Sequence, residues 1–230
     1  MVDIVPLQVD VHSRIKFNDA RMDHVNDQQV IPLLFQEFLL ASRNYPIVFV
    51  KNTDTGQFQS VCVLGIKPGQ NKFVKNNLWV AGYVPQVVRN APLYLVADAN
   101  DAKRLHLGVD ETSPRIDLDK GELLFDTNGN ESEYLQARKK DLITYFEHEA
   151  ITRNIIDLLV EMDLFLHQHL SVQVNGESVS IKGVYIIDED KLARLSDEQV
   201  LTLHKNGLFA PIYAHLMSLH QLSSVAAFSV

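Results

Sequence analysis

The segment SVQVNGESVSI, residues 171–181, contains the most specific local signal for the fold. Apolar and polar residues alternate on both sides of Asn175 and Gly176, as they do in half-buried strands. Asn and Gly both accept the positive φ angles that a two-residue turn between antiparallel strands requires. We therefore predict a β-hairpin here, whose second strand continues through YIID at 185–188.

Two more antiparallel hairpins are predicted on the N-terminal side of this one. YPIVFV at 45–50 pairs with FQSVCVLGI at 58–66, and LYLVAD at 93–98 pairs with RLHLGV at 104–109. Each run is rich in β-branched and aromatic residues and is separated from its partner by polar residues. TSPRIDLDKG at 112–121 is expected to cross the surface before a further strand.

Helical periodicity is predicted in several segments. Segment 31–44 has Pro32 in its first turn, and a short helix follows Pro85. A long helix is expected after residue 130, with Asn130 as its N-cap and an apolar face that reaches Phe165. Two C-terminal helices cover 196–207, with a capping box at Ser196 and Gln199, and 210–225.

These elements predict an α+β protein with a mostly antiparallel sheet built from hairpins. We expect one domain over residues 1–230, in which 1–29 form a polar, partly irregular N-terminal segment. No internal repeat or low-complexity linker divides the chain.

Composition excludes several classes of function. The chain has 21 basic against 29 acidic residues, a formal charge of −8, so binding to nucleic acid through clustered cations is not expected. The single cysteine, Cys62, excludes an internal disulfide and a zinc site made of cysteines.

The N-terminus lacks the pattern of an export signal and no window approaches a membrane span, so we expect a cytoplasmic protein.

Motifs for catalysis and for metal binding are absent from the sequence. No GxSxG elbow or P-loop occurs. His167 and His169 lie at the end of the predicted long helix, where residues two apart diverge, and His215 and His220 are separated around the last helix. We therefore predict no metal site and no cofactor.

The irregular region 67–92 is the best candidate for a binding surface. It contains Trp79, Tyr83 and Arg89 within eleven positions, and these residue types dominate binding hot spots. With His24 they are the predicted ligand-binding residues. The alternative interpretation is structural, because a single tryptophan often anchors a core and an arginine often binds loop carbonyls.

Five segments together resemble the SapC family of bacterial proteins. They occur in family order between about residues 24 and 222: VIPLLFQEFLLASRNYPIVF, VLGIKPGQNKFV, YVPQVVRNAPLYL preceded by a tryptophan, LLFDTNGNESEYL, and KGVYIIDEDKLARLSDEQVLTLHKNGLFAPIYAHLMSL. The resemblance implies a context of surface-layer genes or of peptide or nutrient uptake. It implies no established reaction or catalytic residue.

Two hypotheses about function follow. The first is a non-catalytic binding or assembly module for a small ligand or a protein partner, with homo-oligomerisation left open. The second is an enzyme, or an accessory of one, whose site is assembled only by the fold from His24, Glu37, Arg89 and Asp126. Whether the protein is an enzyme stays open, and the missing motifs favour the first hypothesis.

Overall fold

The computed structural model describes residues 4–97, 104–174 and 177–227, which are divided between two compact units. Unit 1 comprises the chain up to Asn26, Val74–Val80 and Gln86–Glu147, and unit 2 comprises Asp27–Phe73, Ala81–Pro85 and the chain from His148. Both units are built from several segments and share one long helix. The division therefore does not test the expectation of a single domain.

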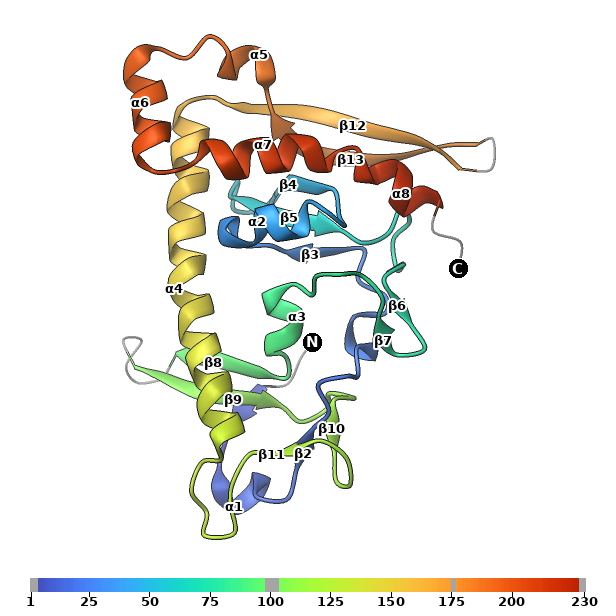
Figure 1. Ribbon diagram of the computed structural model, residues 1–230, viewed down its shortest axis with the longest axis vertical. Helices are drawn as coiled ribbons and strands as arrows, with labels where there is room; N and C mark the ends of the chain where they lie inside the picture. The colour runs from blue at the N-terminus through green and yellow to red at the C-terminus, as the bar shows by residue number, and fades with distance from the viewer. Residues whose placement is uncertain (1–3, 98–103, 175–176, 228–230) are drawn as a thin grey trace. The chain divides into compact units, whose positions relative to one another are not determined.

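Unit 2 is organised around an antiparallel sheet, which has five strands within the described residues (Figure 1). In spatial order they are β12 (Phe165–Val174), β13 (Glu177–Ile187), β4 (Ile47–Lys51), β5 (Phe58–Val63) and β3 (Val30–Pro32). The predicted pairings of β12 with β13 and of β4 with β5 are both confirmed. The turn residues Asn175 and Gly176 lie outside the described part.

Short helices accompany this sheet. They are η2 (Phe35–Glu37), α2 (Phe38–Ala41), α5 (Glu189–Leu192), α6 (Asp197–Lys205), α7 (Phe209–Ser218) and α8 (Gln221–Ala227). The capping box of α6 is present, because the Gln199 amide donates to Ser196 Oγ at 3.3 Å and the Ser196 amide to Gln199 Oε1 at 3.0 Å. The predicted last helix is interrupted after Ser218 and resumes as α8.

Unit 1 contains shorter sheets and the first half of α4 (Glu133–Glu161). One sheet has β1 (Ile4–Pro6), β9 (Leu105–Asp110) and β8 (Leu93–Ala97), and a second has β10 (Ile116–Asp117), β2 (Lys16–Phe17) and β11 (Glu122–Leu123). β6 (Val74–Lys75) pairs with β7 (Leu78–Trp79), and α1 (Val9–His12), η1 (Asp23–Val25) and α3 (Gln86–Asn90) complete the unit. The α+β class with antiparallel sheets is confirmed. Within the described ranges, no helix combines the length and apolar character needed to cross a bilayer.

Two predicted helix boundaries were wrong at their start. Pro32 lies in strand β3 rather than in a first helical turn, because residues 30–32 pair with β5 and the helix begins only after Leu34. The N-cap of α4 is Ser132, whose Oγ accepts from the Leu135 amide at 3.1 Å. Asn130 is instead bound to the preceding loop.

The end of α4 was also predicted too far along the chain. The helix ends at Glu161, and Asp163 adopts a φ of 54°, the left-handed conformation that terminates helices. Leu164 closes the end by donating its amide to the Leu159 carbonyl at 3.0 Å. Phe165 therefore belongs to β12, and its apolar side chain packs as part of the sheet rather than on a helix face.

A buried histidine fixes α7 to two strands of unit 2. The Ile187 amide donates to His215 Nε2 at 3.1 Å, so Nδ1 carries the proton and donates to the Ile47 carbonyl at 2.8 Å. Ser218 Oγ accepts from the Ile47 amide at 2.9 Å. His215 is fully buried, and this burial lowers its pKa to about 4, which keeps the ring neutral at pH 7.

Replacement of this histidine tests its structural role. His215→Leu leaves the Ile187 amide and the Ile47 carbonyl without their partners in a dry site, which costs about 1–3 kcal/mol for each group. We expect the free energy of unfolding, measured with urea, to fall by about 3 kcal/mol. The matched control is the exposed His220, for which the same exchange changes stability by less than about 0.5 kcal/mol.

The pH dependence of unfolding provides a second readout of the same group. The folded-state pKa of His215 lies below the unfolded value of 6.5, so the unfolded chain binds more protons between these two values. The contribution of His215 to stability is therefore complete above pH 6.5 and is lost as the pH falls toward 4. His215→Leu should reduce this slope, and an unchanged slope would contradict the assignment of a neutral buried ring.

Candidate functional site

Arg115 is the central residue of a polar network in unit 1. The sequence predicted that residues 112–121 cross the surface, but the Arg115 side chain is only 1% exposed, which corrects that expectation. Its Nη1 donates to the carbonyls of Val88 at 3.0 Å and Arg89 at 3.1 Å, and also to that of Ala91. Nη1 carries two hydrogens, so these three carbonyls share them, and the remaining N–H groups of the planar guanidinium stay available for other acceptors.

The acceptors are the carbonyls at the C-terminal end of α3. The last carbonyls of a helix have no partner within the helix and carry partial negative charge, so a cation is stabilised there. Arg138, on the first half of α4, donates from Nη2 to the Arg89 carbonyl as well. Two buried guanidinium groups thus fix the end of one short helix.

Asp19 and Tyr134 complete the network. Arg115 Nη2 lies 2.5 Å from Asp19 Oδ1, and the Tyr134 hydroxyl donates to the same oxygen at 2.9 Å. The Tyr134 ring lies 5.9 Å from the Arg138 guanidinium carbon, within cation–π range. Burial lowers the pKa of Arg115, and the Asp19 carboxylate opposes that shift by favouring the charged guanidinium. Burial raises the pKa of Tyr134, so its hydroxyl is neutral at pH 7.

A small polar pocket lies beside this network. It has a volume of about 60 Å³ and is lined from α3 by Gln86, Arg89 and Asn90 and from α4 by Asp141 and Thr144. The Asn90 side chain is 7% exposed, and its Nδ2 has no hydrogen-bond partner among the described protein groups. A buried amide that lacks a partner is unfavourable unless something in the pocket accepts its hydrogens.

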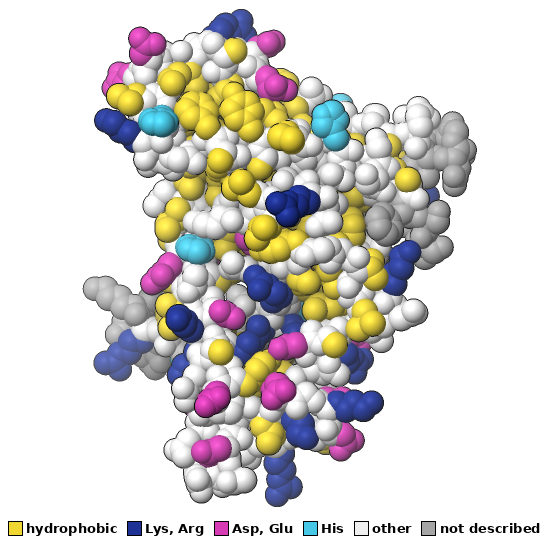
Figure 2. All heavy atoms as spheres, in the orientation of Figure 1, with side chains coloured by type: hydrophobic (Ala, Val, Ile, Leu, Met, Phe, Trp, Pro, Cys, Tyr) yellow, Lys and Arg dark blue, Asp and Glu magenta, His cyan; other side chains and the backbone are white. Residues whose placement is uncertain are grey.

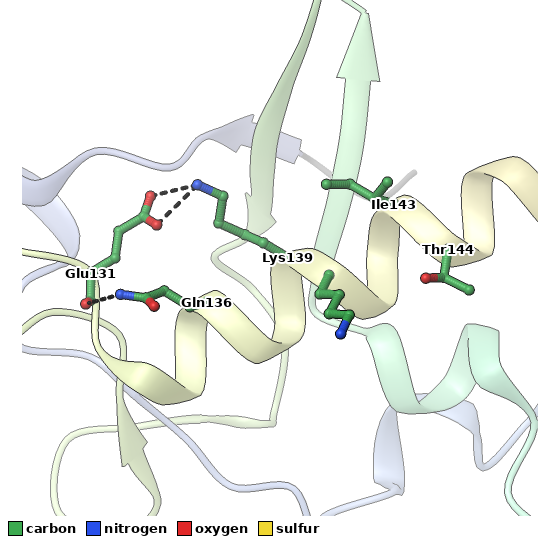
Figure 3. A pocket seen from close by; sticks show the side chains of 6 residues that line it. Glu131, Gln136, Lys139, Ile143 and Thr144 are labelled. Carbon is green, nitrogen blue, oxygen red and sulfur yellow. Dashed lines mark hydrogen bonds and ion pairs between the residues drawn. The ribbon is translucent and has the colours of Figure 1, made fainter.

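A second hollow, of about 280 Å³, lies along the exposed side of α4 (Figure 3). Its polar groups already bind one another: Lys139 Nζ lies 2.7 and 2.9 Å from the two oxygens of Glu131, and Gln136 Nε2 donates to the Glu131 carbonyl at 3.1 Å. Lys140, Ile143 and Thr144 complete the lining. Because these groups satisfy one another, the smaller pocket is the better candidate site.

Two of the four predicted ligand residues lie near the network. Arg89 is exposed and lines the small pocket. Burial, and secondly the charge of Arg115, lower the pKa of His24 to about 4, so its ring is neutral at pH 7. The Val88 backbone favours the protonated ring, but neither ring nitrogen has a partner with hydrogen-bond geometry within the described residues.

The other two predicted ligand residues lie in different units. Trp79 is half-buried at the end of β7 in unit 1, opposite Val74. Tyr83 belongs to unit 2, where its hydroxyl donates to Glu37 Oε1 at 2.7 Å. A joint ligand site of Trp79, Tyr83, Arg89 and His24 therefore stays a prediction.

Two residues of the alternative catalytic set, Glu37 and Asp126, form hydrogen bonds that stabilise the local backbone. Glu37 is 1% exposed, and its Oε2 accepts from the Leu34 amide at 3.0 Å. Asp126 Oδ1 accepts from the amides of Asn128 at 2.8 Å and Asn130 at 2.9 Å, and hydrogen bonds from Asn130 lower its pKa. Of this set, only Arg89 lines the small pocket.

The predicted geometry of the histidine pair was wrong. His167 and His169 lie on β12, where residues two apart share a face, and their ring centroids are 5.1 Å apart. The error follows from extending the preceding helix past Asp163. Among the described residues there is no group of three or more His, Cys, Asp or Glu placed to hold a metal ion.

Most residues of the pocket and of its support were not predicted from the sequence. Arg138 and Asp141 are three apart on a predicted helix, a spacing that places them on one face, and this signal was available. Asn90 directly follows the predicted Arg89. Nothing local distinguishes Arg115 from a surface arginine, because its acceptors lie 24 to 27 positions earlier in the chain.

The chain is thus an α+β protein with a small polar pocket held by buried arginines. The family model for SapC matches residues 7–225, and the chain belongs to the SapC family. Neither a curated protein nor a solved structure matches the chain significantly.

Removal of Arg115 tests whether it holds α3 in place. Arg115→Met removes one donor from each of the carbonyls of Val88, Arg89 and Ala91 and removes the guanidinium partner of Asp19. Breaking a buried charged network of this kind costs about 3 kcal/mol or more. We expect that loss in urea unfolding, with only partial recovery in Arg115→Lys, because an ammonium lacks the planar fork. The exposed Arg14→Met is the control, and an equal effect of both methionine variants would contradict the assignment.

Proposed function

We propose that this SapC-family protein is a non-catalytic binding module that holds a small zwitterion, of the size of an amino acid, in the pocket between α3 and α4. The observation that carries the proposal is Asn90, whose buried amide has an unpartnered Nδ2 at the pocket wall. A carboxylate accepts from such a group, and a charge-assisted hydrogen bond there is stronger than a neutral one.

The charges around the pocket support a zwitterion over a simple anion or cation. Arg89 and Asp141 line it with opposite signs, and Thr144 and Gln86 add neutral polar groups. The pocket and the network behind it together contain three arginines and two aspartates: Arg89, Arg115, Arg138, Asp19 and Asp141. These residues give a local excess of one positive charge in a chain whose net charge is −8. The cationic side suits a carboxylate, and Asp141 suits an ammonium group.

The size of the pocket limits the ligand. A volume of about 60 Å³ is several times the ~10–15 Å³ that one water occupies on this measure, so a few heavy atoms fit. Nucleotides and drug-sized ligands use pockets of ~300–1,000 Å³ and would not be enclosed. An amino acid, or the end of a peptide, also accords with the uptake or surface-layer context that the SapC resemblance implies.

Calorimetric titration of the purified protein with glycine, with acetate and with methylamine tests the proposal. We expect glycine to bind at least tenfold more tightly than either single-charge probe, because only glycine engages both signs. Asn90→Asp keeps the shape and replaces the donor with a second carboxylate, and it should weaken glycine binding at least tenfold. Asp141→Asn should reduce the preference for glycine over acetate.

The control is Gln136→Leu, which changes the neighbouring hollow on α4 and should leave glycine binding unchanged. Circular dichroism and urea unfolding establish that each variant is folded. Equal affinity of folded wild-type protein and Asn90→Asp for glycine, or no binding of glycine at all, would refute the proposal.

A further inference from the structure

His167 and His169 lie close together on β12, the strand at one edge of the unit 2 sheet. Their ring centroids are 5.1 Å apart, and the ring planes are inclined by 79°. Both side chains are exposed, and no hydrogen bond or ion pair among the described residues involves either ring. On the face that Figure 2 draws, histidine side chains (cyan) are scattered rather than gathered in one cluster. The pair on β12 thus offers two adjacent imidazoles to a ligand from solvent.

The backbone of the β12–β13 hairpin sets the position of these two rings. Residues two apart in a strand point to the same face of the sheet, and His167 pairs directly with Tyr185 of β13. The register then shifts, so that His169 stands opposite two residues of β13, Lys182 and Gly183, and Gly183 adopts a φ of 73°. This is a β-bulge, a feature that re-aims side chains and is over-represented beside active sites.

Aromatic side chains hold the ring of His167 in place. Its centroid lies 5.0 Å from that of Tyr185, and the Tyr185 ring meets Phe58 edge to face at 4.9 Å. Phe58 in turn stacks on Phe165, with centroids 4.7 Å apart. Such contacts restrict the orientation of a ring, and a side chain that is already oriented loses less freedom when it binds a ligand.

The spacing of the two rings fits two imidazoles bound to one metal ion. Two imidazoles held by a tetrahedral Zn²⁺ at ~2.0–2.1 Å have ring centres about 5 Å apart, since each centre lies about 1 Å behind the bound nitrogen. The observed separation of 5.1 Å agrees with this value. An edge-to-face contact without a metal also falls in its usual range of ~4.5–7 Å, and metal titration distinguishes the two arrangements.

We propose that His167 and His169 bind one divalent transition-metal ion, Zn²⁺ or an ion of similar ligand preference, through one nitrogen of each ring. Imidazole suits Zn²⁺, Cu²⁺ and Ni²⁺, whereas Mg²⁺ and Ca²⁺ take oxygen ligands. No third His, Cys, Asp or Glu joins the pair among the described residues, so the remaining positions of the ion are open to water or to an anionic ligand. Open positions are typical of zinc sites that act on a ligand, whereas structural zinc sites are closed.

Calorimetric titration of the full chain with ZnCl₂ tests the site. We expect wild-type protein to bind Zn²⁺ and an excess of MgCl₂ not to displace it. His167→Gln and His169→Gln should each weaken binding at least tenfold, because either change removes half of the chelate. The matched control is His204→Gln: His204 is exposed on α6, and its replacement should leave the affinity for Zn²⁺ unchanged. Circular dichroism establishes that each variant is folded.

Pulsed electron paramagnetic resonance of bound Cu²⁺ tests whether both rings share one ion. Cu²⁺ binds the same class of ligand more tightly than Zn²⁺, and the modulation from the remote imidazole nitrogens counts the bound rings. We expect two rings in wild-type protein with less than one equivalent of Cu²⁺, and one ring in His169→Gln.

Four results would each overturn the proposal. They are an absence of Zn²⁺ binding, unchanged affinity in the folded double variant His167→Gln/His169→Gln, equal losses in His204→Gln and His169→Gln, and a single bound imidazole in wild-type protein. No residue of the pocket between α3 and α4 takes part in this site, so these results do not depend on the binding of glycine.

Discussion

The burial of one guanidinium, that of Arg115, is the constraint on which the candidate site depends. A charged group that is almost fully removed from water is tolerated only where it is paired and hydrogen-bonded. The chain meets this demand with the C-terminal carbonyls of α3 and with Asp19. Because these acceptors belong to α3, the same contacts fix the helix that contributes Gln86, Arg89 and Asn90 to the pocket.

Unit 2 also contains a buried polar side chain that fixes a helix, but there the side chain is neutral. His215 donates to one strand and accepts from another, and its burial keeps it uncharged, so it connects α7 to the sheet without the desolvation cost of an ion. This inner contact requires a polar side chain at a buried position of an otherwise uncharged helix.

Elements whose signal is local could be predicted from the sequence, and contacts between distant segments could not. The β12–β13 hairpin and the Ser196 capping box follow from neighbouring residues and are confirmed. The predicted end of α4 was wrong because two signals disagreed there. The apolar pattern continues to Phe165, but the left-handed backbone conformation of Asp163 ends the helix. The Asn76–Asn77 turn before Trp79, with φ of 50° and 63°, was a readable signal that was missed.

The candidate site was even harder to predict from the sequence, because most of its contacts join distant segments. Arg89 was predicted from residue type, but its partner wall on α4 lies some fifty positions later, and only the fold brings Asp141 near it. Arg115 is indistinguishable in sequence from a solvated arginine, since its burial depends on carbonyls that any residue supplies. The network that supports the pocket is made largely of backbone acceptors, and side-chain identity does not reveal these. This explains why the support of the pocket, unlike the main pairings of the sheet, was not predicted.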